Sequence, residues 1–296
     1  MPRNNRKKLS ASDGNTNYLQ QTGQKDNGID TGVELKLIDG VSMYIHTGNC
    51  QDQGAREYQE DSFGYSNIVD SGILSSKGMF AVLSDGMGGL SNGRAVADYT
   101  VQTANSRFSR LDPKINISRQ LKEIVNQIND QVSRQYTDNG TSTAGATMVI
   151  AYIFKNRIYW ASVGDSRLYC FRNGHLIQMN EDHDYRNQMY REYIDTHAGL
   201  DSIESDPRKD SLVSFIGKQD IQRIDCSVRG CKIKPDDVFV LCSDGIYNGI
   251  TEDSIKEILA ANGAQAASEK IVQNIKNANF PGQDNMTVMV IKCSKQ

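Results

Sequence analysis

Two stretches of the chain share one pattern, a short apolar run that ends in Ser-Asp-Gly: residues 79–86 and 238–245. Apolar runs of this length, with β-branched or aromatic residues and a turn signal at the end, predict buried strands rather than helices. Asp85 and Asp244 should therefore leave the core at strand ends. The glycine after each allows a sharp turn, which lets the carboxylate point into a cleft. Asp-Gly is also a common turn pair, so either stretch alone could be an ordinary turn.

Other charged residues lie near the edges of predicted strands. Arg56 carries a planar fork of donors that suits phosphate, and the adjacent carboxylates Glu60 and Asp61 could bind a hard cation. Taken alone, this segment could also be an exposed charge run. Asp165 follows one predicted strand, and Asp284 precedes another.

Together these residues form a set of carboxylates with one arginine and with almost no histidine or cysteine. Oxygen ligands of this kind suit Mg²⁺ or Mn²⁺ rather than Zn²⁺, and cations are needed because like charges repel. Two cations about 4 Å apart could bridge a water molecule, lower its pKa and stabilise an in-line displacement at phosphorus. The guanidinium would then hold the phosphoryl oxygens. The candidate residues are Arg56, Glu60, Asp61, Asp85, Gly86, Asp165, Asp244 and Asp284.

The composition excludes several classes of protein. The chain has 296 residues, 38% of them hydrophobic and 23% charged, and a formal net charge of −3, which is ordinary for a globular protein with a sizeable core. It has no overall positive field for nucleic acid, and no apolar run reaches the ~20 residues of a membrane span. The six cysteines show no Cys-x-x-Cys spacing, which favours free thiols over a zinc site. We therefore expect a cytoplasmic protein.

Composition also divides the chain into regions. Residues 1–35 are rich in Asn, Gln, Gly, Asp and Thr without apolar periodicity, which predicts a disordered N-terminal tail. A folded domain is predicted over residues 36–296, beginning with a strand at 41–46. Apolar content falls over about 182–220, where we predict an irregular flap. A long insertion of this kind is more often functional or mobile than inert.

Apolar residues at helical spacing predict helices over 93–110 and 119–136, the second with Ser118 as its N-cap. A third helix should follow Thr251, which can act as its cap, and a fourth should cover residues 266–278. These helices supply apolar faces that can pack on sheets.

Alternation with a period of two predicts a β-meander over residues 145–179. Asn173-Gly174 between its last two apolar runs is a strong signal for a two-residue hairpin. A final strand is expected over 286–291. Asp165 lies between two strands of the predicted meander.

Six short motifs occur in a recognisable order. They are Arg56-x-x-x-Glu60-Asp61, Ser84-Asp85-Gly86-Met87-Gly88-Gly89, Gly145-Ala146-Thr147, Val163-Gly164-Asp165-Ser166-Arg167, Cys242-Ser243-Asp244-Gly245 and Asp284-Asn285-Met286-Thr287-Val288. In this order and spacing the chain resembles the metal-dependent protein phosphatase 2C (PPM) family over about residues 40–293.

The resemblance implies an α+β fold, a four-layer αββα sandwich of two antiparallel sheets flanked by helices. It implies a phosphatase that hydrolyses phosphoserine and phosphothreonine with a metal-activated water and without a phosphoenzyme. The implied cofactors are two Mn²⁺ or Mg²⁺ ions, with a weaker third site in bacterial members. The implied partners are a phosphorylated protein and an opposing Ser/Thr kinase, and we expect a monomer without a nucleic-acid partner.

The resemblance also implies a role for each metal ligand. Asp85 would bridge two ions. Asp244 and Asp284 would complete one site, and Glu60 with the carbonyl of Gly86 would serve the other.

Three more roles come from the same resemblance. Asp165, together with Asp244, would match the third metal site, and Arg56 would bind phosphate. Asp61 would act behind the ligands, where it would hold water and orient its neighbours.

The chain departs from the family pattern at several positions. Met87 replaces a histidine that many eukaryotic members use as a proposed general acid, so water or another residue must protonate the leaving group. Met87 and the long flap resemble bacterial members. Arg94 replaces the usual glutamate at a helix start, and Asp206-Pro207 stands where bacterial members often have His-Pro. His183 could act as an acid, but a hydrogen-bonded surface or flap histidine is the expected interpretation.

Two alternatives remain beside the phosphatase. A pseudophosphatase that acts as a regulatory binding module would usually lack a metal ligand, and none is missing here. A metal-dependent nuclease or small-phosphoester hydrolase would use similar carboxylates, but a nuclease would also need a basic groove.

Overall fold

The computed structural model describes residues 33–36, 42–66, 71–88, 92–138, 140–196 and 200–295. Most of the predicted N-terminal tail, and Gly89 of the second motif, lie outside the described residues. Strand β1 (Val33–Lys36) pairs with β2. The division into a tail over residues 1–35 and a domain over residues 36–296 stays a prediction.

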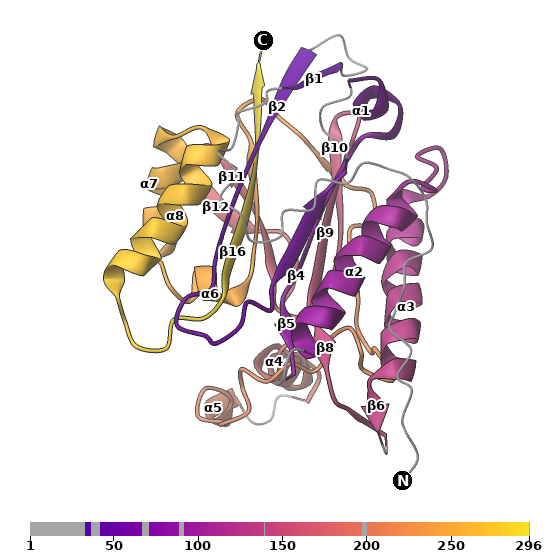
Figure 1. The fold of residues 1–296 in the computed structure, drawn as a ribbon, viewed down its shortest axis with the longest axis vertical. Helices are drawn as coiled ribbons and strands as arrows, with labels where there is room; N and C mark the ends of the chain where they lie inside the picture. The colour runs from indigo at the N-terminus through magenta and orange to yellow at the C-terminus, as the bar shows by residue number, and fades with distance from the viewer. Residues whose placement is uncertain are drawn as a thin grey trace.

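Two antiparallel sheets form the centre of the molecule (Figure 1). The first sheet has the order β1 (Val33–Lys36), β2 (Ser42–Asp52), β16 (Met286–Lys295), β15 (Val238–Cys242), β11 (Arg167–Arg172) and β12 (His175–Gln178). The second has the order β13 (Asp225–Cys226), β10 (Arg157–Val163), β9 (Met148–Phe154), β4 (Met79–Ser84) and β3 (Ser62–Tyr65), with β14 (Cys231–Lys232) also paired to β10.

Helices cover the outer face of each sheet (Figure 1). Helices α2 (Asn92–Phe108) and α3 (Ile117–Gln135) pack on the second sheet, and α7 (Glu252–Ala261) and α8 (Ala264–Ala278) cover the first. The predicted four-layer αββα sandwich is confirmed. The shorter elements are α1 (Ser71–Lys77), β5 (Gly86–Met87), β6 (Thr137–Asp138), β7 (Thr141–Ser142), β8 (Gly145–Ala146), α4 (Tyr185–Thr196), α5 (Leu200–Ile203) and α6 (Asp244–Tyr247).

Three apolar clusters hold these layers together. Leu83 and Leu241 belong to the cluster between the two sheets, Leu121 and Ile128 anchor α3 to the second sheet, and Ile271 anchors α8 to the first. All are almost completely buried. A fully buried side chain of this size stabilises the fold by about 1.5–3 kcal/mol, so the sheets are fixed rigidly relative to each other.

The structure corrects one predicted helix cap and confirms another. The N-cap of α3 is Asn116, whose side chain accepts from the backbone N–H of Arg119 (3.0 Å), and not Ser118. The prediction failed because both residues are good caps, and the Ser118 hydroxyl instead donates to the carbonyl of Val228. The Thr251 cap of α7 is confirmed, since its hydroxyl accepts from the N–H of Ser254.

The predicted β-meander is split between the two sheets. Strands β9 and β10 pair in the second sheet, whereas β11 and β12 pair in the first. Between them Gly164 adopts a φ of +99°, and the chain crosses from one sheet to the other. Period-two alternation reports strands but not their partners, so it could not reveal the crossing. The Asn173-Gly174 hairpin is confirmed, with positive φ at both residues.

The flap is more regular than predicted, because residues 185–196 form the helix α4 (Figure 1). Asp184 begins the helix by accepting from the backbone N–H of Asn187 (2.7 Å). Helix α4 buries little of its surface, so its sequence lacks the apolar stripe from which a helix could have been predicted.

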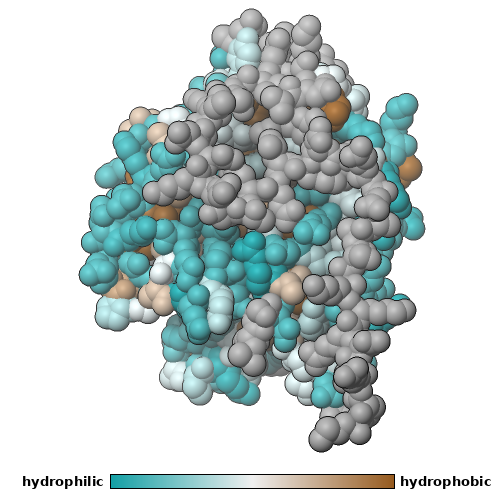
Figure 2. Space-filling model, viewed as in Figure 1, coloured by the Kyte–Doolittle hydropathy of each residue, from teal (hydrophilic) through white to brown (hydrophobic). Residues whose placement is uncertain are grey.

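On the face shown in Figure 2 the described residues are mainly hydrophilic, with scattered hydrophobic side chains. None of the described helices has the length and hydropathy needed to cross a bilayer.

Candidate active site

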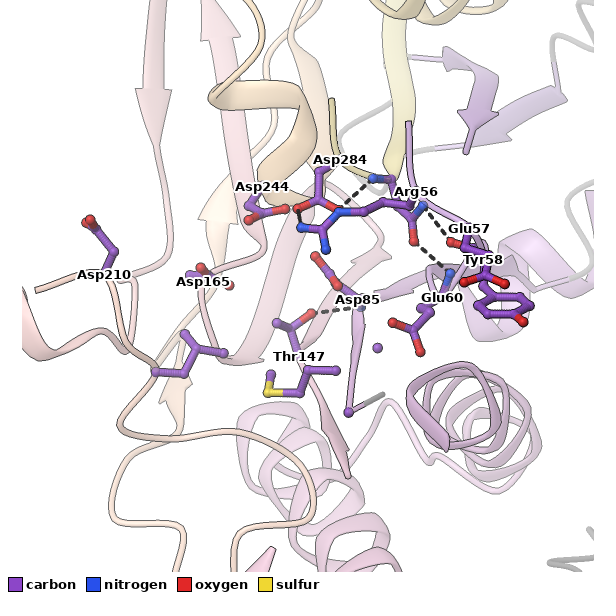
Figure 3. A pocket seen from close by; sticks show the side chains of 15 residues that line it. Arg56, Glu57, Tyr58, Glu60, Asp85, Thr147, Asp165, Asp210, Asp244 and Asp284 are labelled. Atoms are coloured by element: carbon purple, nitrogen blue, oxygen red, sulfur yellow. Dashed lines mark hydrogen bonds and ion pairs between the residues drawn. The ribbon is translucent and has the colours of Figure 1, made fainter. Parts of the chain in front are cut away.

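A cleft of about 590 Å³ lies where strands of both sheets end (Figure 3). Strands β4 and β10 bring Asp85 and Asp165 from one sheet, and β15 brings Asp244 from the other. The cleft therefore collects carboxylates that are far apart in the sequence. Its lining consists of Arg56, Glu57, Tyr58, Glu60, Asp85, Gly86, Met87, Gly88, Thr147, Asp165, Asp210, Leu212, Asp244, Asp284 and Asn285.

Thr147 fixes the backbone of Asp85 at the end of β4. Its hydroxyl accepts from the N–H of Asp85 (2.9 Å), and its own N–H donates to the Asp85 carbonyl (2.8 Å). The hydroxyl of Ser84 donates to the carbonyl of Thr147 (2.6 Å). These three bonds hold the Asp85 carboxylate over the cleft (Figure 3).

Gly86 permits a close approach between three chain segments. A Cβ atom at this position would lie 2.4 Å from the Gly93 carbonyl oxygen and 2.7 Å from the Glu60 carbonyl oxygen. Any larger residue would have to displace backbone atoms. The glycine therefore keeps β5, the start of α2 and the Glu60 segment together.

The second Ser-Asp-Gly corner leads into helix α6, of which Asp244 is the first residue. Burial raises the pKa of Asp244, and the neighbouring Asp284 raises it further, while a hydrogen bond with Asp85 acts in the opposite direction. The two corners therefore meet directly at their carboxylates. Gly245 allows this packing, because a Cβ there would lie 2.1 Å from the carbonyl oxygen of Asn285.

Asp61 is fully buried behind this lining. Its Oδ2 accepts from the hydroxyls of Ser243 (2.8 Å) and Thr287 (2.6 Å). Its Oδ1 has no hydrogen-bond partner among the described residues. Burial raises the pKa of Asp61 to about 7 in spite of the two donors. The interpretation of this segment as a simple exposed charge run is therefore wrong for Asp61.

Asn285 holds the segment that carries Glu60. Its side-chain carbonyl accepts from the N–H of Glu60 (2.7 Å), and its amide group donates to the carbonyls of Gln53 (2.9 Å) and Tyr58 (3.0 Å). The Oε1 atom of Glu60 is buried and has no partner among the described residues. A buried, unsatisfied carboxylate oxygen is costly unless a cation or donor meets it.

Asp165 follows β10 and occupies the other side of the cleft (Figure 3). Burial raises its pKa to about 7, and the charges of Asp244 and Asp182 act in the same direction, while a hydrogen bond from Tyr247 opposes them. The Arg167 guanidinium lies over the Tyr247 ring, 3.5 Å from its centroid. Asp165 is therefore near Asp244, and no ion pair joins it to a lysine or arginine among the residues that the structure describes.

Arg56 lies at the mouth of the cleft and is 59% exposed. Its Nη2 contacts Oδ2 of Asp284 at 2.6 Å (Figure 3). Among the described residues it is the only lysine or arginine that lines the cleft. An exposed guanidinium in this position can bind an anion that enters from solvent.

The oxygen atoms of the cleft decide whether divalent cations can bind there. No group of three or more His, Cys, Asp or Glu side chains in the described part of the chain is already arranged to hold a metal ion. Burial, and then the charges of Asp61, Asp244, Asp165 and Asp284, raise the pKa of Asp85 well above its usual range. Such crowded carboxylates, with unsatisfied oxygens on Glu60 and Asp61, need positive charge, and oxygen donors suit Mg²⁺ or Mn²⁺. The donor set of the cleft therefore fits these cations.

The structure brings together all the residues predicted for the site. Seven line the cleft, namely Arg56, Glu60, Asp85, Gly86, Asp165, Asp244 and Asp284, and Asp61 lies behind them.

His183 does not line the cleft and is only 2% exposed. Its Nδ1 accepts from the N–H of Gly164 (3.2 Å), so the expectation of a hydrogen-bonded flap histidine is confirmed, and the residue is buried there rather than at the surface. Asp206 is also outside the lining and pairs with Arg208 (2.9 Å). Met87 lines the cleft, where it can donate no proton.

Sequence reasoning missed several residues of the cleft. Asn285 stands next to Asp284 in a recognised motif, so its position was a usable signal for a supporting role. Asp210 and Leu212 come from the flap, and Tyr58 from the segment beside Arg56. No pattern in the sequence marks these three residues, because their place in the cleft depends on how the flap and the segment beside Arg56 fold.

Comparison with known proteins identifies the family. The model of the family described as protein phosphatase 2C matches residues 45–198. The chain belongs to the protein phosphatase 2C family. It is 26% identical to the Serine/threonine phosphatase stp of Listeria welshimeri over 254 residues, which are 84% of this chain and 96% of the relative. It is also 26% identical to Protein phosphatase PhpP of Streptococcus pneumoniae, over 73% of this chain and 86% of the relative.

Solved structures agree with this membership at the level of the fold. The serine/threonine phosphatase of S. agalactiae has a TM-score of 0.69 and 20% identity, with coverage of 86% of this chain and 100% of that one. The catalytic domain of the phosphatase PstP, solved with two manganese ions, has a TM-score of 0.65 and 19% identity, with coverage of 86% and 100%. These members of the family are bacterial, as Met87 and the flap led us to expect.

Proposed function

We propose that this protein is a metal-dependent protein Ser/Thr phosphatase that hydrolyses phosphoserine and phosphothreonine. The observation that carries the proposal is the meeting of Asp85 and Asp244, from opposite sheets, in a cleft with Arg56 at its mouth. Family membership and the names of its relatives support the same activity.

Two Mn²⁺ or Mg²⁺ ions fit the donor set, as in the PstP structure with two manganese ions. Asp85 would contact both ions. Asp244 and Asp284 would hold one, and Glu60 with the Gly86 carbonyl would hold the other. A third ion would use Asp165 with Asp244. Bound cations would lower the pKa of a water molecule and offset charge on the phosphoryl group.

The chain's own residues would orient the substrate. Arg56 would exchange its contact with Asp284 for the phosphoryl oxygens, which suit its fork of donors. Met87 has no proton to give, so the departing serine or threonine oxygen must take its proton from water or from another residue. Tyr58 and Leu212 would contact the substrate chain beside the phosphate, because both line the cleft.

The proposal includes a phosphorylated protein as substrate and an opposing Ser/Thr kinase. It also includes a monomeric enzyme in the cytoplasm, with support from the six free thiols of its cysteines. A pseudophosphatase is less well supported, because every position expected to bind metal carries a suitable residue. A nuclease is opposed by the cleft itself, which offers a single cationic side chain among its described residues.

Phosphate release from a phosphothreonine peptide tests the proposal. Purified protein should be active with Mn²⁺ or Mg²⁺, inactive with EDTA, and insensitive to okadaic-type inhibitors. A phosphotyrosine peptide and a DNA oligonucleotide serve as comparison substrates and should be turned over poorly or not at all. Folded protein that stays inactive with every metal would instead favour a regulatory binding module.

A further inference from the structure

Arg94 connects the first turn of α2 to the segment that carries Glu60. Its Nη1 donates to the carbonyl oxygens of Gln59 (3.2 Å) and Asp61 (3.0 Å), the residues on either side of Glu60. Its Nε donates to Oδ2 of Asp98 (2.8 Å), one turn further along α2. The guanidinium is half-buried, and its planar fork is therefore fixed on one side by the helix and on the other by the Glu60 segment.

The side chain of Glu60 depends on this support. Its Oε1 has no hydrogen-bond partner among the described residues, and a Cβ on Gly93 would lie 2.6 Å from that oxygen. The carboxylate therefore occupies a narrow space without a bond to Oε1 that would set its direction. The backbone N–H of Arg94 also contacts the Glu60 carboxylate. The backbone that carries Glu60 is held by the Arg94 guanidinium on one side and by Asn285 on the other.

The two contacts to carbonyl groups require a donor at this position. The family pattern has a glutamate where Arg94 stands, and an ionised glutamate has no proton to donate to two carbonyl groups. Arg94 does not line the cleft, so it is not placed to contact substrate.

We propose that Arg94 is a positioning residue that orients Glu60 toward a divalent cation at the Gly86 carbonyl. The inference rests on the proposed function, because it assigns Glu60 to a Mn²⁺ or Mg²⁺ site. Without the guanidinium, the carbonyls of Gln59 and Asp61 lose a shared donor, and the Glu60 segment can move away from α2. Partners behind a ligand of this kind typically contribute about 10–100-fold to metal affinity.

Isothermal titration of the full chain with Mn²⁺ alone tests the role of Arg94. We expect Arg94→Met to raise the Kd for Mn²⁺ about tenfold, while phosphatase activity at saturating Mn²⁺ stays within about threefold of wild type. Asp98→Asn is the matched control, because it removes the ion pair on α2 but keeps both contacts of Nη1. It should change the Kd by less than about twofold. Arg94→Gln, which keeps one side-chain donor, should give an intermediate Kd and replaces Arg94→Met if that variant is unfolded by circular dichroism.

A double-variant cycle shows whether Arg94 acts through Glu60. In a Glu60→Gln background, Arg94→Met should weaken Mn²⁺ binding no further. An Arg94→Met protein that melts at a lower temperature but binds Mn²⁺ with wild-type affinity would overturn the role, as would equal weakening in both backgrounds. A wild-type chain that neither binds Mn²⁺ nor releases phosphate would overturn the proposed function itself, so the two failures are distinguishable.

Discussion

The two Ser-Asp-Gly corners share a tripeptide but lead into different structures. After Asp85 the chain continues as β5 and pairs with β8, whereas after Asp244 it turns at once into α6. Both carboxylates nevertheless reach the same cleft. In both corners a buried strand ends and a glycine follows the aspartate. The element that comes next depends on the other segments of the same chain that pack beside the corner.

The serines of the two corners differ more strongly. Ser84 donates to a backbone carbonyl, that of Thr147, and so holds two strands together. The Ser243 hydroxyl also binds the neighbouring strand, because it accepts from the N–H of Thr287 (3.0 Å), but in addition it donates to the buried carboxylate of Asp61 and so stabilises a charge close to the cleft. The same residue type in the same motif therefore binds backbone in both sheets, but only Ser243 also binds a buried carboxylate.

The largest effect is expected at the residues that the corners share. Asp85→Asn and Asp244→Asn should each reduce phosphate release by about 10³-fold or more, because each removes a charge that cation binding requires. Both variants should stay folded, since loss of a buried, crowded carboxylate relieves repulsion in the metal-free chain. Asp206→Asn, outside the cleft lining, is the control and should keep activity within about twofold. Near-normal turnover by either corner variant would refute the shared site.

Substitution of each serine by alanine should show that the two serines have different roles. Ser243→Ala should weaken Mn²⁺ binding about 10–100-fold, because Asp61 keeps only the Thr287 donor. Ser84→Ala should lower the free energy of unfolding by about 1–2 kcal/mol and leave the Kd for Mn²⁺ within about twofold. Calorimetric titration and urea unfolding measure the two quantities, and identical effects from the two variants would remove the distinction.

Recognition of the corners was possible from the sequence because their signals are local. A short apolar run that meets Ser-Asp-Gly marks a strand end, and Asn173-Gly174 marks a hairpin, and the structure has both. The order of motifs then gave the family and the four-layer fold. Seven of the eight predicted site residues line one cleft, and all seven belong to motifs that could be recognised from the sequence.

What the sequence could not provide depends on contacts between distant segments. The crossing at Gly164 from β10 to β11 and the choice of Asn116 as a cap leave no distinctive pattern. Helix α4 was not predicted because it buries little apolar surface. The position of Asp210 in the cleft was not predicted either. The donors that Arg94 supplies beside Glu60 likewise depend on how α2 meets that segment.

A smaller effect is expected at His183, which should change how the free energy of unfolding depends on pH. Burial lowers the pKa of His183 to about 4, with a smaller contribution from Arg223 in the same direction, while Asp225 and Asp182 oppose the shift. The unfolded chain therefore binds more protons between about pH 6.5 and pH 4, and stability falls as pH drops through this window. We expect His183→Asn, which keeps an acceptor for Gly164, to reduce this loss by about 2 kcal/mol between pH 8 and pH 5. Urea unfolding with EDTA measures the slope, and an unchanged slope would contradict a buried neutral histidine.

The most direct measurement is the number of Mn²⁺ ions bound at equilibrium by wild-type protein and by the Asp85→Asn and Asp244→Asn variants. If the two corners form one centre, wild-type protein should bind about two ions per chain at micromolar to millimolar Mn²⁺, and each substitution should abolish or greatly weaken that binding. Wild-type stoichiometry and affinity in either variant, from folded protein, would show that the corners do not share a metal centre and would contradict the account.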